Sequence, residues 1–454
     1  MGPHEVTPWR ATAAHHRALV AAPAILLLAA LGRRLDLVLI GLPFLLIAAW
    51  SLWARPNQTP EVDAHLGPTV VHEGQSLEWS ATLTTPPGTE DLVALLAPCD
   101  HIVTQPDSGG LAHAVPAGDT RARLTARLTA TRWGERDAGL GLLSATSPFG
   151  AFRWAPPQLS GARIRVLPEK DPFTTRVGMP HPQGIVGLNR SARRGDGTDF
   201  AALRAYGPGD RLRRINWRVS TRSTTLQVTA THADEDTSVQ IVLDAFHDIG
   251  ASAGLGGTRS SLDTGVRATA ALTEHYLRAG ERVGLLVLGT ARLRPLAAAA
   301  GPRHLRRVLD SLAMIRPGTA QPAQDTPRVD HHLAKVSNAS VVIVLTPGVS
   351  DRALDVALRL GNRGLTVVVI DTLPPVARGV LGLAELTAIT PIVEHREIRA
   401  AQLAWRLRLL ERAHHLNHLR ATGIPVIEWS GPGSLDETLR QVDRRARAPR
   451  LARR

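Results

Sequence analysis

Two long apolar runs open the chain, at residues 18–31 and 37–53, with a short polar stretch between them. A helix needs about 17–20 apolar residues to cross the hydrocarbon core of a bilayer, and both runs approach that length. We therefore expect a two-helix transmembrane hairpin at residues 18–53, preceded by an N-terminal tail at residues 1–17.

A secretory signal peptide is the alternative interpretation of the first run. A signal peptide leads into a small-residue cleavage site and a polar mature chain, whereas here Arg33 and Arg34 are followed by the second run. Trp50 and Trp53 end that run, as tryptophans at a membrane interface do. Arginines precede the first run and also lie between the two, so charge does not settle the orientation. We expect a multi-pass protein of the cell membrane with cytoplasmic soluble domains.

Short runs of alternating apolar and polar residues fill positions 59–168. A period of two is typical of strands with one buried face, and Pro- and Gly-rich turns separate the runs. This spacing predicts a small β-sandwich. Its histidines, His65, His72 and His113, are scattered and form no candidate catalytic or ligating cluster.

After residue 237 the pattern changes to continuous Val/Ile/Leu runs that alternate with amphipathic segments. Such a pattern predicts a parallel sheet with helices on both faces. Strands are expected at 239–243, 282–288, 340–345, 365–370 and 425–428, and helices at 264–278, 302–313, 351–363, 397–421 and 434–445. Ligands gather at the carboxyl ends of such strands, where Asp244, Thr346 and Asp371 stand.

The helix expected at 397–421 carries four residues with the spacing of zinc ligands, namely Glu411, His414, His415 and His418. Nothing completes that set, and its order differs from the His-Glu zinc motif, so we favour a solvated helix face. Leu403, Leu407 and Leu410 also share one face, and we expect them to form the buried stripe of this helix.

Composition restricts the possible functions further. A chain of 454 residues exceeds one ordinary core, and its single cysteine, Cys99, excludes an intrachain disulfide. The sequence has neither a P-loop nor a nucleophile elbow. We therefore predict a protein that is not an enzyme, with no cofactor and no small-molecule substrate.

The net charge of +13 is concentrated in two places. Residues 189–222 hold nine arginines and three aspartates, and residues 439–454 hold seven arginines and one aspartate. We expect residues 431–454 to form a C-terminal helix and a basic tail, which is either solvated or in contact with anionic lipid. Nucleic-acid binding is not predicted, because no recognised nucleic-acid-binding fold accompanies the charge.

The other basic segment, at 189–236, also holds one of the two tyrosines in the chain. The run from Tyr206 to Asp210 predicts a turn, since proline fixes φ and Gly209 permits a positive φ. The candidate interaction residues are Tyr206, Gly209, Asp210, Arg213, Arg214, Asn216 and Trp217. Arginine beside an aromatic residue is typical of interface hot spots and also of clusters within one chain. These arginines therefore either dock a partner or clamp the segment to its own domain, through acidic residues such as Asp234.

Residues 200–228, which include the sequence LRAYGPGDRLRRINWRVSTRSTTLQV, resemble the signature of the "domain of unknown function 58" family. The family joins a membrane hairpin, a β-rich domain and this signature to a von Willebrand factor A-like domain. The resemblance therefore implies a doubly wound parallel-sheet domain of that type at residues 237–430. It also implies a MoxR-type AAA+ ATPase as partner, and hence a membrane-anchored adaptor. Asn216 departs from the family pattern, which has aspartate there.

A second departure concerns the metal site of von Willebrand A domains, which begins Asp-x-Ser-x-Ser. This chain has Asp244, then Phe246 and Asp248 in place of the two serines. A phenyl ring cannot bind Mg²⁺, which needs near-ideal octahedral oxygen coordination. We expect the metal site to be lost, unless Asp248, Thr346 or Asp351 compensates. The alternative function is a metal-dependent adhesion or ligand-binding module that faces outward.

Overall fold

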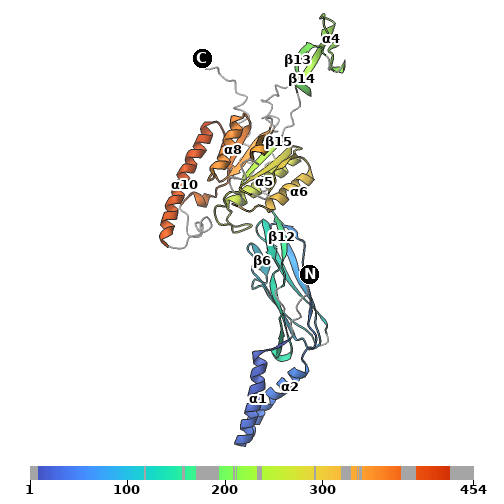
Figure 1. Ribbon diagram of the computed structural model, residues 1–454, viewed down its shortest axis with the longest axis vertical. Coiled ribbons are helices and arrows are strands. Elements are labelled where there is room, and N and C mark those ends of the chain that lie inside the picture. The colour runs from blue at the N-terminus through green and yellow to red at the C-terminus, as the bar shows by residue number, and fades with distance from the viewer. Residues whose placement is uncertain are drawn as a thin grey trace. The chain divides into compact units, whose positions relative to one another are not determined.

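The computed structural model divides into two compact units, Met1–Leu167 and Pro168–Arg454, and each is described by itself (Figure 1). The structure describes residues 9–116, 119–155, 159–169, 194–207, 210, 212–232, 238–290, 293–318, 329–334, 336, 340–379 and 395–429.

Two apolar helices, α1 (Ala13–Gly32) and α2 (Leu35–Trp53), are long and apolar enough to cross a membrane. Helix α1 begins before the apolar run at residue 18, because the Thr12 side chain accepts a hydrogen bond from the His15 amide and caps the helix. The helices pack through small residues such as Ala22 and Gly41, where an added Cβ would lie 3.0 Å from Ile25 Cγ2. Small residues at such a contact are typical of membrane helices.

Residues 9–12, expected in an N-terminal tail, belong instead to the β-rich body of the first unit. Strand β1 (Arg10–Ala11) pairs antiparallel with β11 (Phe152–Trp154). Trp9 is buried in the core of this body, and its Nε1 donates a hydrogen bond to the carbonyl of Gln58 at 2.8 Å. The chain therefore enters and leaves the helical pair at the same body.

The β-rich body contains a five-stranded sheet (β1-β11-β10-β5-β7), a four-stranded sheet (β2-β4-β8-β6) and a three-stranded sheet (β3-β12-β9). Its other strands are β2 (Glu61–Leu66), β3 (Val70–His72), β4 (Ser76–Thr84), β5 (Asp91–Leu96), β6 (Ile102–Gln105), β7 (Gly110–Ala114), β8 (Arg121–Ala130), β9 (Gly134–Ala138), β10 (Gly141–Thr146) and β12 (Ala162–Leu167). Alternate residues of β4 and β8 are buried, as their period of two predicts. They form one core with Trp79, Leu92 and Leu143.

The second unit contains a six-stranded sheet in the order β17-β16-β15-β18-β19-β20. Its strands are β15 (Ser238–Asp244), β16 (Arg282–Leu288), β17 (Leu296–Ala299), β18 (Val341–Thr346), β19 (Thr366–Asp371) and β20 (Val426–Glu428). The strands pair in parallel except β17, which lies antiparallel to β16 and was not expected from the sequence.

Four long helices cover this sheet: α5 (Ser261–Arg278), α6 (Pro302–Ala313), α8 (Asp351–Asn362) and α10 (His395–Ala421). Helices α5 and α6 lie on one side of the sheet, and α8 and α10 on the other (Figure 1). Gly265 lets α5 approach the sheet, since a Cβ there would lie 2.8 Å from Leu243 Cδ1. The neighbouring Val242 points to the other face and packs in one core with α8. The mixed α/β class is therefore confirmed.

Helix α10 buries a different face from the one that the sequence suggested. Trp405, Leu416 and Leu419 are buried against the unit, whereas Leu403, Leu407 and Leu410 are 59%, 56% and 69% exposed. The prediction of a buried Leu403–Leu410 stripe was wrong, because this helix has two apolar faces and periodicity alone cannot tell which one is covered.

The signature segment forms a two-stranded antiparallel sheet of β13 (Arg194–Ala205) and β14 (Gln227–His232). Between them lie a single 3₁₀ turn, η2 (Leu212–Arg214), and one short helix, α4 (Trp217–Ser220). The helix expected at 434–445 and the basic tail lie outside the described residues.

Candidate functional site

The segment between β13 and β14 folds back onto β14 through a few local contacts. Ile215 pairs with Val228 in an isolated β-bridge, and both side chains are buried. The Asn216 amide donates to the Gln227 carbonyl at 2.8 Å. The segment thus has a small core of its own, which holds the residues around it in place.

An ion pair closes the predicted turn. Arg204 donates from both terminal nitrogens to the carboxylate of Asp210, at 2.7 Å for one of them. The Gly207 amide donates to the same carboxylate at 2.9 Å. The hydrogen bonds from Arg204 and then from Gly207 hold the pKa of Asp210 below its usual value. Arg204 was not among the predicted site residues, although it lies in the signature run. Gly209 lies outside the described residues.

Asn216 has a structural role, as the N-cap of α4. Its side-chain oxygen accepts a hydrogen bond from the Val219 amide at 3.3 Å. Asparagine and aspartate are equally good N-caps. The replacement of the family's aspartate by Asn216 therefore preserves the start of this helix.

Several large side chains of the segment face solvent. Trp217 is 62% exposed, Leu212 68%, Leu226 43% and Tyr206 37%. Exposed arginines stand among them, namely Arg213, Arg218 and Arg222. We call these seven residues the signature surface. Of the predicted interaction residues, Tyr206, Arg213 and Trp217 belong to it, Asp210 and Asn216 support it, and Arg214 is half-buried. The acidic residues that were considered as an internal clamp, Asp234 among them, lie outside the described residues.

A second candidate site lies where β15, β18 and β19 end. Asp244 is buried, and its carboxylate accepts hydrogen bonds from the Thr346 hydroxyl at 2.7 Å and from the Phe246 amide at 3.1 Å. Burial raises the pKa of Asp244 to about 6, against the opposing effect of these two hydrogen bonds. Thr346 in turn accepts from the Gly348 amide at 2.9 Å.

Asp371, on the adjacent strand β19, binds arginine. Arg412 of α10 and Arg378 both donate to its Oδ2, the latter at 3.2 Å, and the Leu373 amide donates to its Oδ1 at 2.9 Å. Arg412 also donates to the Pro347 carbonyl at 2.7 Å. The positive charge at the strand ends thus comes from two arginines: Arg378, seven residues after Asp371, and Arg412, which lies on the distant helix α10. No local sequence motif announced it.

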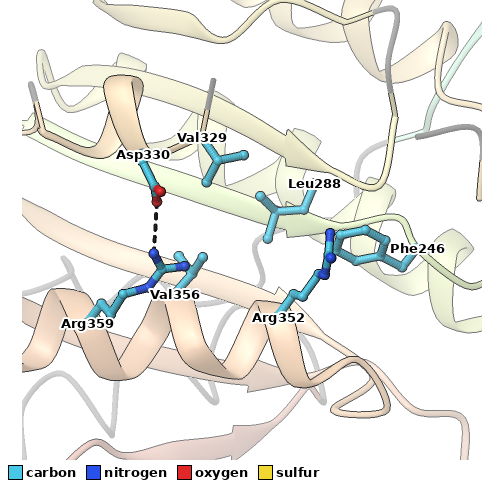
Figure 2. Close-up of a pocket in the computed structure, with 7 residues that line it drawn as sticks. All are labelled: Phe246, Leu288, Val329, Asp330, Arg352, Val356 and Arg359. Carbon is cyan, nitrogen blue, oxygen red and sulfur yellow. Dashed lines mark hydrogen bonds and ion pairs between the residues drawn. The ribbon is translucent and has the colours of Figure 1, made fainter. Parts of the chain in front are cut away.

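Phe246 points to the other side of the strand ends, toward α8. Its ring packs against the core beneath α8, and the Arg352 guanidinium lies 5.9 Å from the ring centroid. Together with Leu288 and Val356 it lines a pocket, at whose far end Arg359 pairs with Asp330 at 2.8 Å (Figure 2). Phe246 therefore contributes its side chain to the core, and its phenyl ring offers no oxygen ligand to a metal ion.

The proposed compensating ligands have other partners. Asp248 accepts from the Leu262 amide at the start of α5, at 3.2 Å, and Asp351 lies 3.4 Å from His415 Nδ1. Within the described residues, no group of three His, Cys, Asp or Glu side chains is placed to hold a metal ion. At the strand ends, oxygen atoms of Asp244 and Thr346 accept hydrogen bonds from N–H and O–H groups of the same domain.

Comparison with known proteins finds a family model that matches the signature and the α/β domain. Residues 202–402 match the family described as "Protein of unknown function DUF58". Uncharacterized proteins of Mycobacterium tuberculosis and Mycobacterium bovis are each 31% identical over 121 residues, which is 26% of this chain and 37% of each relative. The chain thus matches little more than a third of the length of these relatives.

Among solved structures, the cupredoxin domain of amoB from Nitrosocaldus yellowstonii is 16% identical, with a TM-score of 0.18, over 28% of this chain and 98% of that one. The sporulation control protein Spo0M of Bacillus subtilis is 10% identical, with a TM-score of 0.14, over 32% and 57%. These low TM-scores establish no common fold. The resemblance inferred from the signature is confirmed to this extent: residues 202–402 of this chain match the model of the DUF58 family.

Proposed function

We propose that this protein is a membrane-anchored, non-enzymatic adaptor that docks a cytosolic partner, a MoxR-type AAA+ ATPase. Docking uses the signature surface together with the α/β domain. The observation that carries the proposal is Trp217, a large aromatic side chain held 62% exposed by the N-cap of a helix whose base is pinned by Ile215.

Physical chemistry supports a contact role for this surface. An exposed tryptophan and an exposed tyrosine, Trp217 and Tyr206, next to arginines have the composition of an interface hot spot. The ion pair between Arg204 and Asp210 and the small core around Ile215 hold the surface in one conformation, which reduces the entropy that binding costs. The arginines favour an acidic partner surface, because they would steer its approach.

The α/β domain is proposed to be von Willebrand factor A-like. A parallel sheet with helices on both faces, with Asp244 and Thr346 at adjacent strand ends, supports that assignment. Because Arg412 binds Asp371 in the same region, we propose that this domain recognises its partner without a divalent ion.

The two apolar helices are proposed to anchor the chain as a hairpin, with the soluble parts in the cytoplasm. The contact between Trp9 and Gln58 supports a hairpin, because it brings the two outer ends of the helical pair together. A reporter fused after Arg454 tests the orientation: an external signal would remove any contact with a cytosolic ATPase.

The docking test uses the full chain in detergent and a purified MoxR-type ATPase, encoded beside it where such a neighbour exists. Loss of a hot-spot tryptophan costs about 2 kcal/mol or more, so Trp217→Ala should raise the Kd roughly 30-fold. Phe149→Ala is the matched control, since Phe149 is also an exposed aromatic (61%) but lies in the first unit, and it should bind like the parent.

The outcomes separate the parts of the proposal. No binding by the parent chain rejects the ATPase as partner. Binding by the parent with an unchanged Kd for folded Trp217→Ala rejects the signature surface. A tight heat of Mg²⁺ or Mn²⁺ binding that Asp244→Ala abolishes would favour instead the outward-facing, metal-dependent module.

A further inference from the structure

Helix α10 carries an apolar stripe that the described part of the chain leaves uncovered. Leu403, Leu407 and Leu410 are each more than half exposed, while the opposite face of the helix is buried through Trp405, Leu416 and Leu419. Single exposed leucines are common on protein surfaces, but leucines at successive turns of a helix form a contiguous apolar patch. Such a patch is typical of an interaction site.

The spacing of the stripe is that of a coiled-coil seam. Ala400, Leu403, Leu407 and Leu410 alternate steps of three and four residues, the pattern of heptad positions a and d. His414 and Asn417 continue the pattern with polar residues, so the seam ends there. A helix with this seam fits another helix that presents the same repeat.

The charges beside the seam select the partner and its direction. Arg399 and Arg406 occupy g positions on one flank, and Glu411 occupies an e position on the other. In a parallel pair each g residue faces the e residue five positions later in its partner, which brings Arg406 to Glu411 of the second copy, a carboxylate that also pairs with Arg408 of its own helix at 3.0 Å. In an antiparallel pair, arginine would face arginine. We propose that α10 of a second copy of this chain packs in parallel and in register against this stripe.

The seam is short, and its size predicts how the dimer behaves. Three leucines cover far less than the roughly 800 Å² per partner of a standard interface. The contact is therefore weak in dilute solution and forms where the chain is concentrated. Its strength in the cell rests on the proposed membrane anchoring, which confines the copies to one surface. The proposed contact between two α10 helices does not depend on the ATPase or on the signature surface.

Disulfide crosslinking of the full chain in proteoliposomes tests both the contact and its direction. In a Cys99→Ser background, Leu403→Cys and Leu410→Cys should each crosslink with its own kind, because a parallel, in-register pair brings equivalent residues within disulfide reach. Leu255→Cys is the matched control, since Leu255 is an exposed leucine of the same unit outside the stripe. Crosslinking at 403 and 410 should be at least about tenfold faster than at 255.

Charge exchange gives a second, independent readout. Arg406→Glu places two carboxylates beside each other across the seam and should slow crosslinking at 403, and Arg406→Glu with Glu411→Arg should restore it. Circular dichroism of each variant shows that it is folded.

Three results overturn the proposal. If Leu403→Cys crosslinks no faster than Leu255→Cys, the crosslinks arise from random collision between chains. Crosslinking only in mixtures of the 403 and 410 variants means an antiparallel pair. No crosslink in folded variants at high protein density means that another partner, or residues 431–454 of the same chain, covers the stripe.

Discussion

Replacing Arg412 by methionine removes the cation that meets Asp371 at the strand ends. Both side chains are buried, at 10% and 7% exposure, and Arg378 stays within hydrogen-bond reach of the same carboxylate. Breaking a buried ion pair by removing one partner costs about 3–5 kcal/mol. Because Arg378 retains part of the interaction, we expect Arg412→Met to lower the free energy of unfolding of the second unit by about 2–4 kcal/mol.

A double variant separates charge pairing from packing. Asp371→Asn alone leaves Arg412 without its carboxylate and should also destabilise the unit. Removing both charges is often nearly neutral for a buried pair. Arg412→Met combined with Asp371→Asn should therefore cost less than the two single changes together, by at least about 1 kcal/mol of coupling.

Hydrogen exchange of the full chain in detergent suits this test, because it reports each unit separately. Peptides from β18 and β19 should exchange roughly 30- to 700-fold faster in Arg412→Met, the factor that 2–4 kcal/mol implies. Peptides from the β-rich body serve as the internal control and should not change. A change below about 0.5 kcal/mol in Arg412→Met, or single costs that simply add, would refute the idea that this arginine neutralises the strand ends.

Three further predictions concern other positions. The pKa of Asp244 is raised from 3.8 to about 6, so the folded chain binds more protons than the unfolded chain between these values, and stability falls as pH rises through that window. Asp244→Asn removes this titration and should gain about 2 kcal/mol relative to the parent between pH 4 and pH 7 in paired thermal unfolding; a pH-independent difference would contradict it. Gly139→Ala should lower the melting temperature, since Gly139 has φ +77° and an added Cβ would lie 2.9 Å from Trp79 Cδ1; an unchanged value would show that the strand ends there adapt. Gly41→Leu should separate α1 from α2 and speed proteolysis at the helix ends, whereas Gly41→Ala should have a much smaller effect.

The positions of most strands and helices in the α/β domain were predictable from the sequence. The edge strand β17 and the contacts between distant elements were not. Strand β16 and helix α6 fall at the predicted residues, because a buried Val/Leu run and a 3.6-residue period are strong local signals. Strand β17 has the sequence LAAA and no such signal, since alanine favours helices over strands.

The sites depended on contacts that no local pattern contains. Arg412 and Asp371 are 41 residues apart in the sequence, and no local sequence pattern near either residue predicts that they pair. The outward leucines of α10 show the same limit, since two apolar stripes on one helix look alike until the fold covers one of them. By contrast, the exposure of Trp217 and the turn at Asp210 follow from local turn and cap chemistry, and the sequence already singled out both residues.

The contacts around Trp9 have a mechanical consequence. Trp9 donates to the Gln58 carbonyl, and Arg55 donates to the Trp9 carbonyl and lies over the Phe152 ring, so both outer ends of the helical pair are held to the β-rich body. If α1 and α2 span a bilayer as proposed, the β-rich body is attached to the membrane at two points and cannot rotate about a single flexible link. Any large movement of the second unit would then have to come from the chain that follows this body.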